Sequence, residues 1–167
     1  MTLSISRLIG VGAAALFVTT NAHAHANDQH VDARPKPARK EQTAWGIAGD
    51  AKNVRRTIEI TMLDAMRFTP EAIDVRRGET IRLGMKNSGQ LLHELVIGTR
   101  QELDQHAALM AKFPHMEHDE AYMAHVAPGE TGEIVWTFNR AGTFHFACLI
   151  PGHYESGMVG RIKVAIR

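Results

Sequence analysis

The stretch FHFACLIPGHYESGMVGRIKV, residues 144–164, contains the single cysteine of a 167-residue chain. Cys148 ends a hydrophobic run with strand-like alternation, His153 follows in a loop with Pro and Gly, and Met158 opens a second strand-like run. His153 lies five residues after Cys148, and Met158 lies five residues after His153. The stretch therefore predicts a strand, a loop and a strand, with soft donor atoms gathered at the loop.

The chain from Arg55 onward has the pattern of a β-sandwich. From Arg55 onward, short runs with period-two alternation or β-branched residues are separated by Gly, Pro and Asn. The predicted strands are 55–63, 72–78, 80–87, 93–98, 133–138, 142–148 and 158–166. We expect an all-β fold, a Greek-key sandwich of about seven to eight strands. Residues 100–113 have helical spacing and end at Pro114, which predicts a helical insertion between strands.

The N-terminal segment predicts export. Arg7 precedes the apolar run LIGVGAAALFV (8–18), and NAHAHA (21–26) offers small-x-small cleavage sites. The run is short for a membrane span of about 20 residues. We therefore expect a periplasmic protein with no stable membrane insertion after cleavage. The predicted organisation is a signal peptide at 1–26, a flexible polar linker at 27–44 and a single domain at 45–167.

Charge and motifs exclude several classes of function. The chain has 19 Lys and Arg residues against 18 Asp and Glu, and the predicted signal removes only Arg7. The mature chain would then be balanced in charge, without the basic excess that marks a nucleic-acid partner. G-x-S-x-G, P-loop, H-E-x-x-H and Gly-rich dinucleotide motifs are also missing. No enzyme class is indicated.

The lone cysteine has few roles open to it in an oxidising compartment. An intrachain disulfide is excluded, which leaves an intermolecular bridge, a buried inert thiol, a nucleophile or a metal ligand. A copper ion that cycles between Cu(I) and Cu(II) takes a thiolate, two imidazoles and a weak axial thioether. Cys148, His153 and Met158 supply three of these donors. His93, which begins a predicted strand after a polar turn, is the candidate for the second imidazole.

These features resemble the cupredoxins, the type 1 copper proteins related to plastocyanin, azurin and rusticyanin. The segments that carry the resemblance are FTPEAIDVRRGETIRL (68–83), NSGQLLHELVIG (87–98) and CLIPGHYESGM (148–158). A closer resemblance is to the CopI-type periplasmic cupredoxins linked to bacterial copper tolerance, through WGIAGD (45–50) and residues 66–80, 116–142 and 146–154. The resemblance implies a cupredoxin fold and one type 1 copper ion. Its ligands would be His93, Cys148, His153 and Met158.

One residue departs from the pattern of plastocyanin and azurin. Those proteins place Asn directly after the upstream ligand histidine, where its side chain ties the loops around the thiolate. This chain has Glu94 at that position. Because hydrogen bonds around the ligands tune a metal site, we expect Glu94 to distort the copper centre.

The insertion and the segment after it suggest a second copper site. They contain soft and borderline donors of the kind that hold Cu(I) or Cu(II), namely Met110, His115, Met116, His118, Met123 and His125. The alternative is that the helix methionines pack in the core and the histidines are surface residues. Both interpretations remain open at this point.

The sequence favours a copper protein that serves copper tolerance through one-electron redox or copper holding. An alternative is a dedicated electron-transfer shuttle whose partner would be a cytochrome or a copper oxidase or reductase. A copper enzyme domain would need paired H-x-H ligands, and none follows the signal. We therefore expect a copper-binding and electron-transfer protein rather than an enzyme.

Overall fold

The computed structural model describes residues 40–114, 116 and 119–166. The predicted signal peptide at 1–26 and most of the predicted linker lie outside these residues. The described end of the linker is bound to the domain, because Gln42 Nε2 donates to Gly46 O and the Gln42 and Asn139 amides exchange two hydrogen bonds. In the described part of the chain, no helix is long and apolar enough to cross a membrane.

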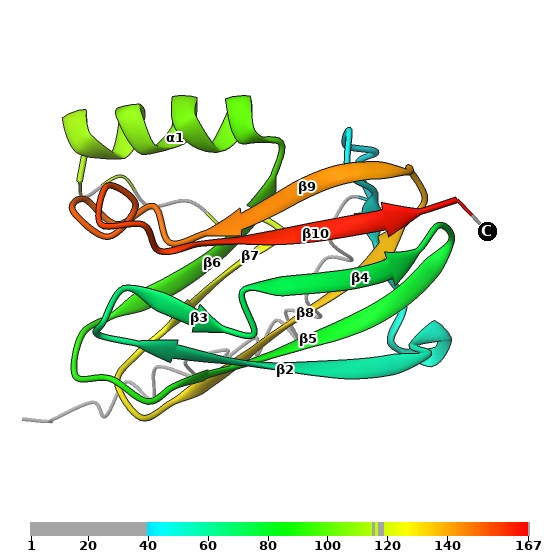
Figure 1. Cartoon of the computed structure of the whole chain (residues 1–167), viewed down its shortest axis with the longest axis horizontal. Coiled ribbons are helices and arrows are strands. Elements are labelled where there is room, and N and C mark those ends of the chain that lie inside the picture. The colour runs from blue at the N-terminus through cyan, green and yellow to red at the C-terminus, as the bar shows by residue number, and fades with distance from the viewer. Residues whose placement is uncertain (1–39, 115, 117–118, 167) are drawn as a thin grey trace, which may run out of the picture. The chain divides into compact units, whose positions relative to one another are not determined.

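Two five-stranded sheets enclose the main core (Figure 1). The first has the order β1 (Ile47–Ala48), β8 (Thr131–Phe138), β5 (Glu79–Asn87), β2 (Arg56–Leu63) and β3 (Arg67–Thr69). The second has the order β4 (Ala72–Arg76), β10 (Val159–Ala165), β9 (Gly142–Ala147), β6 (His93–Gly98) and β7 (Met123–Val126). The described helices are a short 3-10 helix, η1 (Ala51–Asn53), and α1 (Arg100–Lys112). The predicted Greek-key sandwich with a helical insertion is confirmed.

The described residues form more strands than the seven to eight that the sequence predicts. All seven predicted strands are present, with small differences at their ends. The structure adds β1, β3 and β7, which have two, three and four residues. Segments this short cannot display a repeating pattern, so their pairing is decided by the neighbouring strands.

Alternation of inward and outward side chains builds the core. In β5, Ile81, Leu83 and Met85 are buried between the sheets. Burial of a side chain of this size contributes about 1.5–3 kcal/mol. Phe68 from the first sheet and Phe146 from the second meet edge to face, with ring centroids 5.0 Å apart. This contact joins the two sheets directly.

Strand β6 is buried along its whole length, because α1 covers the second sheet from outside (Figure 1). The helix begins at a capping box, in which Thr99 accepts from the Glu102 N–H and Glu102 accepts from the Thr99 N–H. A second apolar cluster joins helix and sheet, and its buried members are Val96, Leu103, Ala107, Met110, Met123, Ala147 and Leu149. The neighbouring strands β6 and β9 are therefore held from both sides.

Gly160 on β10 provides a test of the packing between the sheets. A Cβ at this position would lie 2.0 Å from Cζ of Phe146, which sits opposite it on β9. Because Phe146 is fully buried, we expect Gly160→Ala to lower the free energy of unfolding by about 1–3 kcal/mol, measured by urea denaturation.

The matched control is Gly84→Ala, also within a strand. The three atoms nearest to its Cβ would all belong to the carboxylate end of the exposed Glu59 side chain, the closest at 2.7 Å, and this side chain can move aside. We expect little change in the free energy of unfolding for this variant. Equal losses in the two variants would contradict the proposed packing role of Gly160.

Candidate metal centre

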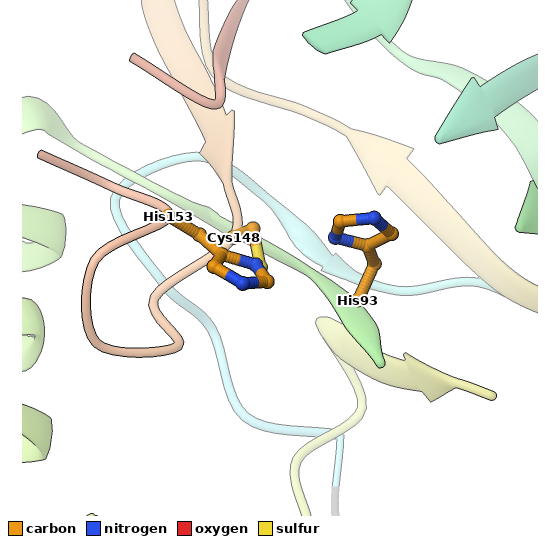
Figure 2. A group of neighbouring side chains, drawn as sticks. All are labelled: His93, Cys148 and His153. Carbon is orange, nitrogen blue, oxygen red and sulfur yellow. The ribbon is translucent and has the colours of Figure 1, made fainter. Parts of the chain in front are cut away.

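Three side chains of metal-ligand type converge at one end of the second sheet. His93 is the first residue of β6, Cys148 follows the last residue of β9, and His153 lies in the loop between β9 and β10. One donor atom from each lies within 4.8 Å of the other two, and Cys148 Sγ is 3.3 Å from His153 Nδ1. Figure 2 shows the His93 ring facing the Cys148 and His153 pair. The structure thus brings together three of the four predicted ligands.

Backbone hydrogen bonds fix the loop that carries His153. The Cys148 N–H donates to Met158 O at 3.1 Å, which closes the base of the loop, and the Met158 N–H donates to His153 O at 3.1 Å. Gly152 has φ +89°, a conformation that favours glycine and lets the chain turn before His153. Met158 is fully buried in the same core cluster as Cys148. Its backbone is therefore tied to the backbones of Cys148 and His153.

Asp64, which the sequence analysis missed, orients the ring of His93. The carboxylate lies 3.0 Å from His93 Nε2, and since a carboxylate only accepts, Nε2 carries the proton. His93 Nδ1 is buried and has no hydrogen-bond partner among the described residues. A buried nitrogen with a free lone pair, beside a cysteine sulfur and a second imidazole nitrogen, is a donor set suited to copper. The residues present therefore fit the metal that the sequence implies.

The Glu94 side chain links β6 to the loop after β9, from the position that holds Asn in plastocyanin and azurin. This buried side chain accepts the Leu149 N–H at 2.7 Å through Oε1. Its other oxygen lies 2.9 Å from His125 Nε2 on the paired strand β7. Glu94 therefore still connects the start of β6 to the loop after Cys148, and it places a carboxylate near the thiol.

Burial controls the charge of the centre. It raises the pKa of the Cys148 thiol to about 12, against an opposing effect of the Glu94 and Ile150 backbone N–H groups. Burial also lowers the pKa of His153, and the neighbouring His93 lowers it further. Without a metal, both groups are held neutral near pH 7. A bound cation would reverse this preference at the thiol, because a coordinated cysteine loses its proton.

The described residues of the predicted second site divide into two groups. Met110 and Met123 are buried in the cluster between α1 and the sheet, as the packing alternative predicts. Met116 and His125 are exposed, while His115 and His118 lie outside the described residues. A cavity of about 610 Å³ joins part of this set to the centre, and its lining includes Glu94, Met110, Met116, His125 and His153.

Comparison with known proteins agrees with this geometry. The family described as "Copper binding proteins, plastocyanin/azurin family" matches residues 54–165. The chain is 48% identical over 152 residues to the "Copper-resistant cuproprotein CopI" of Rubrivivax gelatinosus, covering 90% of this chain and 92% of the relative. It is 35% identical to the protein of the same name from Pseudomonas aeruginosa, covering 95% and 97%.

Solved structures with a similar fold include two auracyanins. Reduced auracyanin of Roseiflexus castenholzii superposes with a TM-score of 0.58 at 24% identity, covering 67% of this chain and 98% of that protein. Auracyanin B superposes with a TM-score of 0.58 at 19% identity, covering 77% and 99%. At these identities the likeness supports the fold.

Reactivity of the Cys148 thiol tests the electrostatics of the metal-free centre. With a pKa of about 12, the native thiol should react with a water-soluble disulfide reagent at pH 8 more than about 100-fold slower than the urea-unfolded chain. The native rate should keep rising with pH, about tenfold per unit between pH 8 and 10, because only the thiolate reacts. The unfolded chain should level off above about pH 8.5.

The chain has one cysteine, so the whole signal comes from Cys148. The unfolded protein is the control for the intrinsic reactivity of the thiol. A native rate that levels off near pH 8 to 9 would contradict the raised pKa.

Proposed function

The chain belongs to the plastocyanin/azurin family of copper-binding proteins, and from this premise we propose that His93, Cys148, His153 and Met158 hold one type 1 copper ion. The observation that carries the proposal is the convergence of His93, Cys148 and His153 donor atoms within 4.8 Å. Met158 would add the weak axial thioether, since its backbone is bonded to both Cys148 and His153. Copper, when bound, supplies a one-electron couple between Cu(I) and Cu(II).

The protein's own contribution is to keep the donors in place. Asp64 holds the His93 ring, Glu94 holds the loop at Leu149, and the core buries the Cys148 sulfur away from water. His153 is the ligand with partial exposure, and it lines the cavity at the surface. Electrons would reach the centre through this imidazole.

We propose that the biological role is copper tolerance in the periplasm. Two relatives that match along most of this chain are named copper-resistant cuproproteins. The predicted signal peptide at 1–26 agrees with a periplasmic location. The role requires copper binding and electron transfer, without turnover of an organic substrate.

A second copper site beside the first would suit this role. The cavity beside His153 presents Met110, Met116 and His125, which are donors for cuprous or cupric ions. Of the rest of the candidate set, His115 and His118 lie outside the described residues, and Met123 packs between α1 and the sheet instead of lining the cavity. Copper held there would lie next to the Cys148 centre. It could then pass into that centre or exchange an electron with the copper bound there.

The competing function is a shuttle between respiratory partners, such as a cytochrome or a copper oxidase or reductase. Leu91 and Leu92 are exposed, and with Pro151 they line the cavity beside His153. Such an apolar surface could receive a redox partner. A shuttle needs only the single type 1 ion, whereas copper handling favours additional bound copper.

A copper titration of the purified protein, with bound metal counted and the visible spectrum recorded, tests the proposed site. We expect a thiolate charge-transfer band that saturates at one copper per chain and is lost in Cys148→Ala, because that variant removes the sulfur donor. His106→Ala is the matched control, since His106 lies on α1 outside the converging group. Absence of a coloured band in the wild type would contradict the proposal.

The same titration separates the two functions. Copper handling predicts further copper that remains bound to Cys148→Ala and is lost when Met116→Leu and His125→Asn are added. A shuttle predicts one copper in the wild type and none in Cys148→Ala.

Growth in excess copper tests the biological role. A strain that lacks the gene should grow more poorly than its parent, and the wild-type gene should restore growth. Cys148→Ala should fail to restore growth, because this variant lacks the thiolate centre. A second copper site would still be present in this variant. Full restoration by Cys148→Ala at equal protein level would contradict a role of the type 1 centre in tolerance.

A further inference from the structure

Asp64 connects the turn after β2 to the segment that leads into β6. The turn is closed by the Met66 N–H, which donates to Leu63 O at 2.9 Å. From this turn the Asp64 carboxylate accepts three hydrogen bonds, from His93 Nε2 at 3.0 Å, the Gln90 N–H at 2.7 Å and the Leu91 N–H at 3.3 Å. One side chain therefore fixes both the ligand histidine and the backbone just before it.

Gly89 makes room for this carboxylate. A Cβ at position 89 would lie 1.9 Å from Asp64 Oδ1 and 2.6 Å from its Cγ. The backbone of Gly89 is not in the left-handed region that favours glycine. Glycine is thus needed at this position for space, and the space is occupied by Asp64.

We propose that Asp64 is a positioning residue for the copper centre: it fixes the Nε2–H tautomer of His93, presents Nδ1 to the metal and favours Cu(II) over Cu(I). Gly89 contributes as well, because a residue without a Cβ leaves room for the Asp64 carboxylate. The inference rests on the copper site proposed above and deepens it.

The effect on copper follows from charge. A fixed negative charge attracts a doubly charged ion more strongly than a singly charged one. A carboxylate that accepts the outer N–H of a ligand histidine also makes the imidazole a better donor, and loss of such a partner typically costs about 10–100-fold in metal affinity. Asp64 retains 35% side-chain exposure, so solvent screens part of the Coulomb effect while the hydrogen bond persists.

The tautomer of His93 can be measured in the metal-free protein. Long-range nitrogen–proton NMR of the full chain should find His93 protonated at Nε2 alone in the wild type. Asp64→Ala removes the acceptor, so a mixture of tautomers or a change to Nδ1–H is expected. Asp74→Asn, an exposed acidic residue on β4, is the control and should leave His93 unchanged. An unaltered tautomer in Asp64→Ala would overturn the positioning role.

The reduction potential of the copper-loaded protein measures the preference between oxidation states. Asp64→Asn keeps an oxygen that can accept from Nε2 and removes the charge, so its potential should rise. Each tenfold loss of Cu(II) affinity that Cu(I) does not share raises a one-electron potential by about 59 mV. An unchanged potential, or an equal rise in Asp74→Asn, would overturn the preference for Cu(II).

A double-mutant cycle tests the partnership of Asp64 and Gly89. Gly89→Ala should displace the carboxylate and shift the potential and the His93 tautomer in the same direction as Asp64→Ala. In the Asp64→Ala background, Gly89→Ala should add little, because the clashing group is gone. Equal effects of Gly89→Ala in both backgrounds would overturn the assigned role of Gly89.

These outcomes separate the inference from the proposed function. A wild-type protein without a thiolate band would overturn the copper site and, with it, this inference. A normal band together with an unchanged potential and tautomer in the Asp64 variants would overturn the inference alone.

Discussion

Burial of the Cys148 thiol is the constraint on which the rest of the site depends. Burial disfavours the thiolate and keeps the metal-free side chain protonated. A metal ion must therefore supply the positive charge that stabilises the sulfur anion. Because the sulfur is enclosed in the core, the other donors must already be in place when the ion arrives. The two sheets and α1 hold the donors in place, because they fix β6, which carries His93, and the end of β9, which Cys148 follows.

Strand pairing explains why the candidate ligands meet at one end of the second sheet. β6 and β9 are antiparallel, and Val96 lies opposite Ala147. The start of β6, at His93, and the position after β9, at Cys148, are thus at the same end. β10 leaves from this end too, since Val159 also lies opposite Ala147. The topology gathers donors that are far apart in sequence, and the rigidity of three strands limits how far they can move when the charge of the metal changes.

Local spacing predicts the part of the centre that one loop supplies. Cys148 and His153 follow from the strand–loop–strand pattern, and His93 follows from its place at a strand start. The contact between Asp64 and His93 spans 29 residues and depends on how the turn after β2 meets the segment before β6. The sequence pattern within each segment does not indicate this contact. The short strands β1, β3 and β7 are likewise not indicated by any pattern. Likewise, sequence identified Glu94 as a departure, but its bond to the Leu149 N–H required the folded loop.

The two carboxylates beside the centre differ in the groups that they contact. Glu94 lies beside His125 on the paired strand β7 and accepts the Leu149 N–H, so its carboxylate is directed at β7 and at the backbone after Cys148. In the described part of the chain, Asp64 forms no ion pair with a lysine or arginine, and its contacts are His93 and two backbone N–H groups. An anionic group directed at a ligand stabilises the more highly charged ion. The Asp64 contact is thus directed at a candidate ligand, whereas the Glu94 contact is directed at the backbone after Cys148.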